Sequence, residues 1–341
     1  MREQLVVVAL GGNAISPPGS ASPIPAQYEA TMETAHHLAH LTRRPLVVTH
    51  GNGPQVGNVL LRSDLAAGLL PRLPLDTCVA DLQGGMGFML QQCLDNAFIK
   101  AGVRRSTVTV VTRTVVDAGD PAFRSPSKPI GTFFDETEAR RRMDGHGWVM
   151  REDAGRGWRR VVPSPEPIEI VEQPAIEALL HTGVVVVAAG GGGIPVVRQP
   201  DGSLAGVEAV VDKDLASALL AANLGAGVLL VLTGVEHVAV DFGRPTQRDL
   251  HELDAATLAG HAADGQFAPG SMLPKVQAVL RFLSGGGRLR SGTGGRPGPW
   301  GACCRGRTGR RRRARPARTT GARGGRAGSG GRSRRRHARP R

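Results

Sequence analysis

The chain has 341 residues, of which 40% are hydrophobic and only 4% aromatic, enough to fill one large α/β domain with mainly aliphatic side chains. The positive charge behind its net charge of +14 lies at one end, because residues 288–341 hold 19 of the 43 Lys and Arg residues and no acidic ones. Residues 1–287 therefore contain 24 basic and 29 acidic side chains. This body has the charge balance of an ordinary soluble enzyme, and no apolar run reaches the roughly 20 residues that a membrane span requires, so we expect a cytoplasmic protein.

Five short runs rich in Val and Leu predict the strands of a sheet that is buried on both faces. They lie at 5–10, 45–50, 106–112, 183–190 and 227–235. Helical patterns lie between them, at 26–41, 54–69, 77–101, 176–181 and 215–224. Alternating strands and helices predict a three-layer α/β/α sandwich with a mainly parallel open sheet.

Residues 114–165 interrupt this alternation. The segment is polar, rich in turn residues and too long for a simple connection, so it predicts a small lobe inserted into the domain. A disordered linker is the alternative. The lobe is favoured because the segment contains aromatic residues that could form a core of their own, namely Phe123, Phe133, Phe134, Trp148 and Trp158.

The hydrophobic pattern ends at about residue 284. We therefore expect a catalytic domain over residues 1–287 and a disordered, Arg- and Gly-rich tail over 288–341. Such a tail can bind nucleic acid non-specifically through its charge. Over a functional tail we favour the interpretation that the tail is the product of a frameshift near residue 287, since Arg, Gly, Pro and Ala are the residues that a GC-rich gene yields when it is read out of frame.

Metal and nucleophile signatures are missing. The four cysteines, at 78, 93, 303 and 304, lack zinc spacing, and we expect Cys78 and Cys93 to be reduced and partly buried. The sequence also lacks a GxxxxGK[ST] phosphate loop, a GxGxxG loop after the first strand and a nucleophile elbow. A P-loop ATPase, a Rossmann dehydrogenase and a serine or cysteine hydrolase are therefore disfavoured.

Three Gly-rich loops, at 11–13, 51–55 and 190–193, directly follow expected strands. Their amide groups would meet at the carboxyl edge of the sheet, where open parallel sheets bind ligands and where glycine allows close approach to an anion. The chain has only four lysines, and three of them, Lys128, Lys213 and Lys275, also lie in loops marked by Gly or Pro, whereas Lys100 is expected near a helix end. The combination favours electrostatic stabilisation of a transferring phosphoryl group.

The segments VVVALGGNAI, THGNGPQVGN, SPSKPIG, VVDKDLAS and APGSMLPK resemble those of the carbamate kinases, in the amino acid kinase superfamily, and the resemblance runs from about residue 5 to 284 in family order. It implies reversible phosphoryl transfer between ATP and carbamate, with ADP and carbamoyl phosphate on the other side, often at the end of arginine deimination. Magnesium would arrive with the nucleotide rather than in a protein-held metal site. Family members are typically homodimers, and the lobe at 114–165 resembles the subdomain that protrudes from carbamate kinases.

The resemblance also implies roles for individual residues. Lys128 would cover the carbamate, Lys213 and Lys275 would neutralise the phosphates of ATP, and Asp214 would orient these two ammonium groups. The carbamate and the transferring phosphoryl group would be held by residues of two glycine loops, namely Gly11, Gly12, Asn13, Gly51, Asn52 and Gly53. The alternative interpretation is that Lys213 is a solvated lysine and that Asp214 is a carboxylate that suits a helix N-terminus.

The roles of several other residues, and two alternative functions, stay open. His50 is expected to be a hydrogen-bonding residue at a strand end rather than an acid–base catalyst, and Gln55 to help order its loop. Trp158 and His237 stand where the family has Tyr, and we leave His237 outside the site. Another amino acid kinase, acting on an acyl carboxylate or UMP, is the nearest alternative. An inactive kinase is another, since the final strand and helix of the family are replaced by the tail.

Overall fold

The computed structural model describes residues 4–16, 23–41, 44–153, 155–235, 237–269, 271–284, 287–290 and 303–306, with backbone alone for 13, 287–290 and 303–306. All of them belong to the first of two compact units, residues 1–308. Within this part of the chain, no helix is long and apolar enough to cross a membrane.

An eight-stranded sheet forms the centre of this unit, in the order β15-β16-β17-β12-β1-β2-β9-β3. Five neighbouring strands of it are parallel, as the sequence predicts: β12 (Val228–Val231), β1 (Val6–Leu10), β2 (Leu46–His50), β9 (Val185–Val187) and β3 (Thr107–Thr109). The mixed α/β architecture with a mainly parallel sheet is therefore confirmed. The three strands expected to be longest are shorter than their apolar runs, because the runs continue into the loops at the carboxyl edge.

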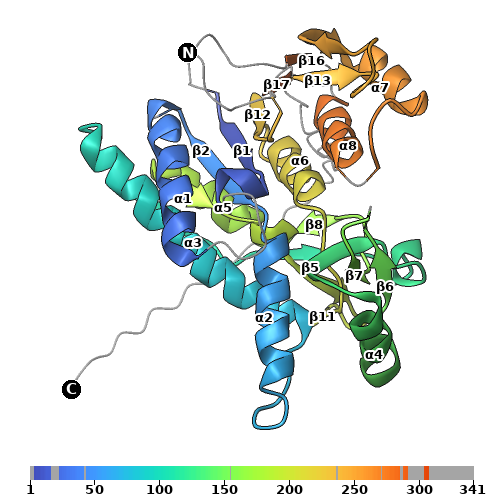
Figure 1. Ribbon diagram of the computed structural model, residues 1–341. Coiled ribbons are helices and arrows are strands. Elements are labelled where there is room, and N and C mark those ends of the chain that lie inside the picture. The colour runs from blue at the N-terminus through green and yellow to red at the C-terminus, as the bar shows by residue number, and fades with distance from the viewer. Residues whose placement is uncertain are drawn as a thin grey trace, which may run out of the picture. The chain divides into compact units, whose positions relative to one another are not determined.

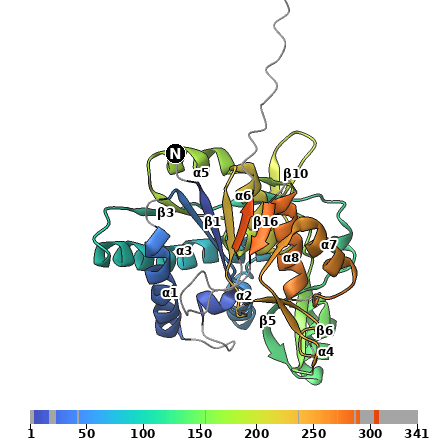
Figure 2. The same ribbon diagram turned by 90° about the horizontal axis from the view of Figure 1, so that it is seen from above.

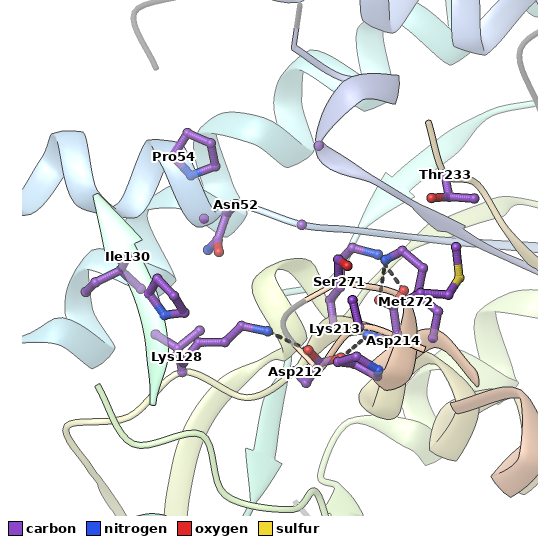
Figure 3. Close-up of a pocket in the computed structure, with 18 of the residues that line it drawn as sticks. Asn52, Pro54, Lys128, Ile130, Asp212, Lys213, Asp214, Thr233, Ser271 and Met272 are labelled. Atoms are coloured by element: carbon purple, nitrogen blue, oxygen red, sulfur yellow. Dashed lines mark hydrogen bonds and ion pairs between the residues drawn. The ribbon is translucent and has the colours of Figure 1, made fainter. Parts of the chain in front are cut away.

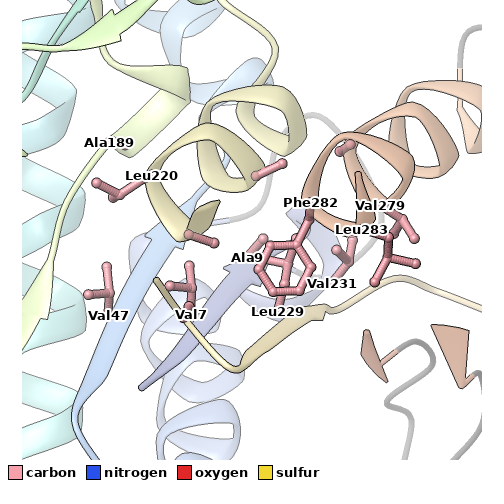
Figure 4. Packing of buried hydrophobic residues seen from close by; sticks show 14 of the residues in the cluster. Val7, Ala9, Val47, Ala189, Leu220, Leu229, Val231, Val279, Phe282 and Leu283 are labelled. Carbon is pink, nitrogen blue, oxygen red and sulfur yellow. The ribbon is translucent and has the colours of Figure 1, made fainter. Parts of the chain in front are cut away.

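Helices cover both faces of the sheet (Figures 1 and 2). Their bounds are α1 Ile24–Leu38, α2 Gly53–Leu65, α3 Leu75–Lys100, α5 Gln173–His181, α6 Lys213–Asn223, α7 Ala255–Ala263 and α8 Met272–Leu283. Alternate residues of β1 face opposite sides, as the period of a strand requires. Val7 and Ala9 pack into the cluster that contains Leu220 of α6 and Phe282 of α8 (Figure 4), whereas Val8 packs into the cluster with α1 and α3.

The edge of the sheet beyond β12 differs from the sequence prediction. The chain beyond residue 284 was expected to leave this edge without a strand. Instead, β17 (Cys303–Gly306) pairs antiparallel with β12, and β16 (Gly287–Arg290) joins β17 to β15 (Glu252–Asp254). Backbone pairing needs no hydrophobic period, which is why the residue pattern did not reveal these strands. The other residues of the expected tail, 291–302 and 307–341, lie outside the described residues.

The inserted lobe contains a three-stranded antiparallel sheet, β5 (Lys128–Phe134), β7 (Trp158–Val162) and β6 (Met150–Glu152), together with α4 (Glu136–His146). Its sheet begins later than residue 114, because β4 (Arg113–Val115) pairs instead with β10 (Ile194–Arg198) and β8 (Glu169–Ile170) in a separate four-stranded sheet. That sheet is completed by β11 (Leu204–Gly206), and β13 (Val238–Val240) with β14 (Arg248–Leu250) forms a two-stranded one.

Aromatic and cationic side chains pack together in the lobe. The rings of Phe134 and Trp148 meet edge to face at 6.3 Å between centroids, and the Arg142 guanidinium lies over both. Phe123 was expected in this core but packs with Val116 and Val211 outside the lobe. The lobe contacts α2 very closely, since a Cβ added to Gly57 would lie 1.8 Å from the Cα of Gly131.

Candidate active site

A cavity of about 740 Å³ lies at the carboxyl edge of the parallel strands. The loops after β1 and β2, the N-terminal ends of α6 and α8, and the first strand of the lobe all contribute to its wall. Parallel strands deliver their loops to one edge, which explains why residues far apart in the sequence meet here. Figure 3 shows this arrangement, with Lys128 on one side and Thr233 and Met272 on the other.

Most of the residues predicted from sequence line this cavity, namely Gly12, Gly51, Asn52, Gly53, Lys128, Lys213, Asp214 and Lys275. Gly11 lines a smaller cavity of about 450 Å³ that shares Gly12, Lys213 and Lys275 with the first. The side chain of Asn13 lies outside the described residues, although its backbone belongs to the short 3-10 helix Gly12–Ala14. The structure thus brings together the two glycine loops and all three lysines that the sequence singled out.

The centre of the site is Asp214, a residue that is 3% exposed. Its Oδ1 accepts a hydrogen bond from Lys213 Nζ at 2.5 Å, and its Oδ2 accepts one from Lys275 Nζ at 2.8 Å. Burial by itself raises the pKa of Asp214, but the attraction of the two ammonium groups outweighs it and holds the pKa well below its usual range. Burial lowers the pKa of Lys213, and the repulsion from Lys275 adds to this effect while Asp214 opposes it.

Packing around Lys213 depends on a missing side chain. A Cβ at Gly51 would lie 2.9 Å from Cδ of Lys213, so any larger residue after β2 would displace this lysine. At the same helix end, Ser217 Oγ donates to the carbonyl of Lys213 at 2.6 Å and lies 2.6 Å from Thr49 Oγ1 on β2. The loop after β2 and the first turn of α6 therefore hold Lys213 from two sides.

Asp212 begins α6 and was not identified from the sequence. Its Oδ1 accepts hydrogen bonds from the backbone amides of Asp214 at 2.9 Å and Leu215 at 3.3 Å, which makes it the N-cap of the helix. Its Oδ2 accepts a hydrogen bond from Lys128 Nζ at 2.5 Å. An Asp directly before an apolar helical run is a recognisable capping signal, whereas its ion pair with a lysine 84 residues away has no local signal.

Two polar side chains at the carboxyl end of β2 differ in character. The Asn52 side chain is buried and its Nδ2 has no hydrogen-bond partner among the described residues, which leaves the N–H groups of this amide for a ligand of the cavity. His50 is also buried, and its Nδ1 lies 3.1 Å from the carbonyl oxygen of Gly51, which can only accept. Burial lowers the pKa of His50 to about 4, so the ring is neutral at pH 7. This agrees with the expected structural role of His50.

The third glycine loop is held by Gln83 of α3, a second residue that the sequence analysis missed. Its Nε2 donates to the carbonyls of Thr112 and Gly190, each at 3.0 Å, and its Oε1 accepts from the Thr112 amide at 2.7 Å. In this loop Gly191, with φ of 68°, lies in the left-handed region that favours glycine, and a Cβ there would clash with the Asn52 amide. No sequence pattern distinguishes a buried Gln on a long helix.

The far end of the cavity is more apolar. It is lined by residues in and around β13, by the segment between α7 and α8, and by the start of α8, namely Thr233, Val235, His237, Ala239, Phe242, Gln266, Phe267, Ala268 and Met272. His237, which the sequence analysis left outside the site, lines this end of the cavity, and its ring packs at 4.5 Å between centroids on His251. The residue pattern did not predict β13, the short strand that directly follows His237.

Arginines of the lobe close the opposite wall. Arg156 and Arg159 lie over the ring of Phe133, at 5.1 and 5.2 Å from its centroid, and all three residues line the cavity. Asp153 forms ion pairs with both arginines, and these hydrogen bonds lower its pKa. The lobe thus presents positive charge toward the cavity from Lys128 and from this pair.

Known proteins match this chain over most of its length. The model of the amino acid kinase family matches residues 4–290. The carbamate kinase-like protein YahI of Escherichia coli (strain K12) is 48% identical over 291 residues, which cover 84% of this chain and 92% of that protein. Carbamate kinase 1 of Enterococcus faecium is also 48% identical, over 82% of this chain and 89% of its own length.

A solved structure agrees with the sequence matches. The carbamate kinase from Giardia lamblia bound to AMP-PNP is 41% identical and superposes with a TM-score of 0.76, covering 83% of this chain and 90% of that one. Family model, sequence relatives and fold point to the same group of enzymes. The chain therefore belongs to the amino acid kinase family, and within that family to the carbamate kinases.

Proposed function

We propose that the chain catalyses reversible phosphoryl transfer between carbamoyl phosphate and ADP, forming ATP and carbamate, which breaks down to ammonia and CO₂. The observation that carries this proposal is the buried Asp214 carboxylate bound to Lys213 and Lys275, with Lys128 facing the same cavity from the lobe. The names of the relatives at 48% identity support the choice of substrate.

The proposed acceptor end lies between the loops after β1 and β2 and the lobe. There the amides of Gly12 and Gly53 and the buried Asn52 Nδ2 would contact carbamate and the transferring group, and Lys128 would cover them from above. Helix α2 begins at Gly53 without a side-chain cap, so the backbone amides of Gly53 and Gln55 are available to an anion, whereas Pro54 has no N–H. Positive charge and free donors suit a small anionic substrate.

The proposed nucleotide end is the apolar part of the cavity near Phe267 and Met272. A base would lie there, and the phosphates would extend toward Lys213 at the start of α6 and Lys275 in the first turn of α8. The space of about 740 Å³ is large enough for a nucleotide together with a small second substrate. His237 would contact the base or the ribose, since it lines the same end.

The chemistry requires alignment and charge stabilisation rather than proton transfer. In the direction of ATP formation, an oxygen of the ADP β-phosphate attacks phosphorus, and the bond from phosphorus to the carbamate oxygen breaks. Carbamate leaves as an anion, so no side chain has to donate a proton. Lys213 and Lys275 would stabilise the charge on the transferring oxygens, while Lys128 would stabilise the leaving carbamate.

Magnesium fits this scheme as part of the nucleotide substrate. Asp212 and Asp214 line the cavity, but both carboxylates are already bound to lysines. Among the described residues, no group of three or more His, Cys, Asp and Glu side chains is placed to hold a metal ion. The phosphates of ADP or ATP would therefore supply the ligands of Mg²⁺, whose charge would assist the lysines.

We also propose that the enzyme acts as a homodimer in the cytoplasm and that it consumes carbamoyl phosphate from arginine deimination. For the dimer, α3 exposes Phe88 and Ile99, which lie eleven residues apart and hence on one face of the helix. A second copy would cover these apolar side chains. Sedimentation equilibrium tests this directly, and a monomer of 35.8 kDa at assay concentrations would refute the dimer.

The decisive experiment is ATP formation from ADP and carbamoyl phosphate, with Lys128→Ala and Lys100→Ala assayed beside the wild type. Lys100 is an exposed residue in the last turn of α3 and serves as the matched control. We expect turnover in the wild type and in Lys100→Ala, and a fall of at least about 100-fold in Lys128→Ala. Absence of turnover in folded wild-type protein would contradict the proposed function.

A further inference from the structure

Asp212 lies at the junction between the lobe and the sheet domain. The residue is 7% exposed, and the two oxygens of its carboxylate bind different parts of the molecule. Oδ1 caps α6, which carries Lys213 and Asp214, whereas Oδ2 binds Lys128 at the start of β5 (Figure 3). A single side chain therefore connects the lysine of the lobe with the helix that carries the other half of the site.

Other contacts hold the lobe but do not enter the reaction space. Arg142 lies 3.6 Å from Asp64 of α2, and Arg160 lies 3.6 Å from Glu208. Neither pair has the short, hydrogen-bonded geometry of the Lys128–Asp212 pair at 2.5 Å. Of the ion pairs that join the lobe to the rest of the described chain, this one has both of its members on the wall of the cavity.

The side chain of Lys128 is partly exposed and reaches the cavity. It is 33% exposed, it begins at the first residue of β5, and among the described residues it forms an ion pair with Asp212 alone. A long, flexible ammonium side chain samples many rotamers unless a partner selects one. The charged hydrogen bond to Asp212 selects the rotamer that directs Nζ toward the first turn of α6.

We infer that Asp212 is a positioning residue for phosphoryl transfer, acting through Lys128. It holds the ammonium group of Lys128 at a fixed place relative to Lys213 and Asp214, so that the lobe and α6 approach the substrates as one unit. This inference rests on the proposed function, in which Lys128 stabilises the leaving carbamate. Asp212 takes no part in bond making or breaking itself.

Asparagine at position 212 separates the two functions of the carboxylate. Asn is as good an N-cap as Asp, so Asp212→Asn retains the hydrogen bonds to the amides of α6 but places an uncharged amide beside Lys128. We expect kcat to fall about 10- to 100-fold, the loss associated with one hydrogen bond to a charged group, with little change in KM for ADP. Asp135→Asn is the matched control, since Asp135 caps α4 in the lobe, is exposed, and should leave kcat unchanged.

A double-mutant cycle distinguishes positioning from a general structural effect. If Asp212 acts through Lys128, then Asp212→Asn has no further effect in the Lys128→Ala background, and the single Lys128→Ala and the double variant agree within about twofold. A purely structural role would lower kcat by the same factor in both backgrounds. That result, or wild-type kcat in Asp212→Asn, would overturn the inference.

Hydrogen exchange gives a readout that does not depend on turnover. In Asp212→Asn, peptides covering 128–134 should exchange faster than in the wild type, whereas peptides covering 213–223 should be unchanged because the cap remains. If the wild type shows no kinase activity, the proposed function fails, and the exchange experiment still decides whether Asp212 anchors Lys128. Unchanged exchange over 128–134 would refute the anchoring.

Discussion

Replacing Asp214 by Asn should destabilise the ligand-free protein because it leaves buried positive charge without a counter-charge. The carboxylate binds Lys213 and Lys275 through separate oxygens, at 2.5 and 2.8 Å, and the side chain is 4% exposed. An amide of the same size retains one acceptor oxygen and presents a donor to the other ammonium group. Removal of one member of a buried ion pair costs about 3–5 kcal/mol, so we expect the free energy of unfolding to fall by about that amount.

Anions should restore part of this loss. Sulfate or ATP placed between the two ammonium groups supplies the missing negative charge, so either ligand should stabilise Asp214→Asn more than it stabilises the wild type. Urea unfolding measured in sulfate and in chloride at equal ionic strength provides the comparison. Asp81→Asn, at an exposed position of α3, is the control for the loss of one carboxylate.

The pH dependence provides an independent check. Because the folded-state pKa of Asp214 is depressed, its contribution to stability is complete above the unfolded-state value of about 4 and is lost as the pH falls through the folded-state value. The stability of Asp214→Asn should therefore fall less steeply below pH 4. A variant that unfolds within about 1 kcal/mol of the wild type in chloride, with the same response to sulfate, would refute the reasoning.

Two further predictions concern His50 and the end of the chain. Burial lowers the pKa of His50 from 6.5 to about 4, so protonation of this residue should cost the protein about 2 kcal/mol of stability between pH 7 and pH 5. Urea unfolding should show this loss in the wild type and not in His50→Gln. Equal losses in both proteins would contradict the prediction. Removal of residues 309–341 leaves the first compact unit complete and should change Tm little. Removal of 287–341 deletes β16 and β17 and should lower Tm by about 5–10 °C, because about 1 kcal/mol is lost for each of a few hydrogen bonds to β12. Equal melting curves for the two shortened chains would show that these strands do not stabilise the sheet.

The parts of the fold that the sequence could predict are those with local causes. Strands buried on both faces need uninterrupted apolar residues, so the runs at 5–10 and 45–50 identified β1 and β2 to within a residue. The helical pattern at 215–224 likewise identified α6, although its N-cap Asp212 was not identified. The strands β16 and β17 could not be found in this way, because they are held by backbone pairing and their sequences, GRLR and CCRG, have no apolar alternation.

The same distinction applies to the site. Glycine loops and scarce lysines are visible in the sequence, and the structure brings Lys128, Lys213 and Lys275 to one cavity. Contacts that depend on how distant segments pack are not visible. Gln83 binds the loop at Gly190 across 107 positions, and neither residue carries a motif that indicates the other. His237 reaches the cavity only because of where β13 lies in the fold.

The geometry of a helix N-terminus explains how three consecutive residues can serve separate parts of the site. Asp212 is the N-cap and has extended backbone angles, so its side chain turns back over the amides of the first turn and toward the lobe. Lys213 and Asp214 are the first two helical residues, and their side chains leave in other directions, toward the loop after β2 and toward α8. A lysine at a helix start opposes the helix dipole, but the two flanking carboxylates offset this cost. The lobe, β2 and α8 are therefore connected through three residues, and a shift of α6 by even one residue would separate all of these contacts at once.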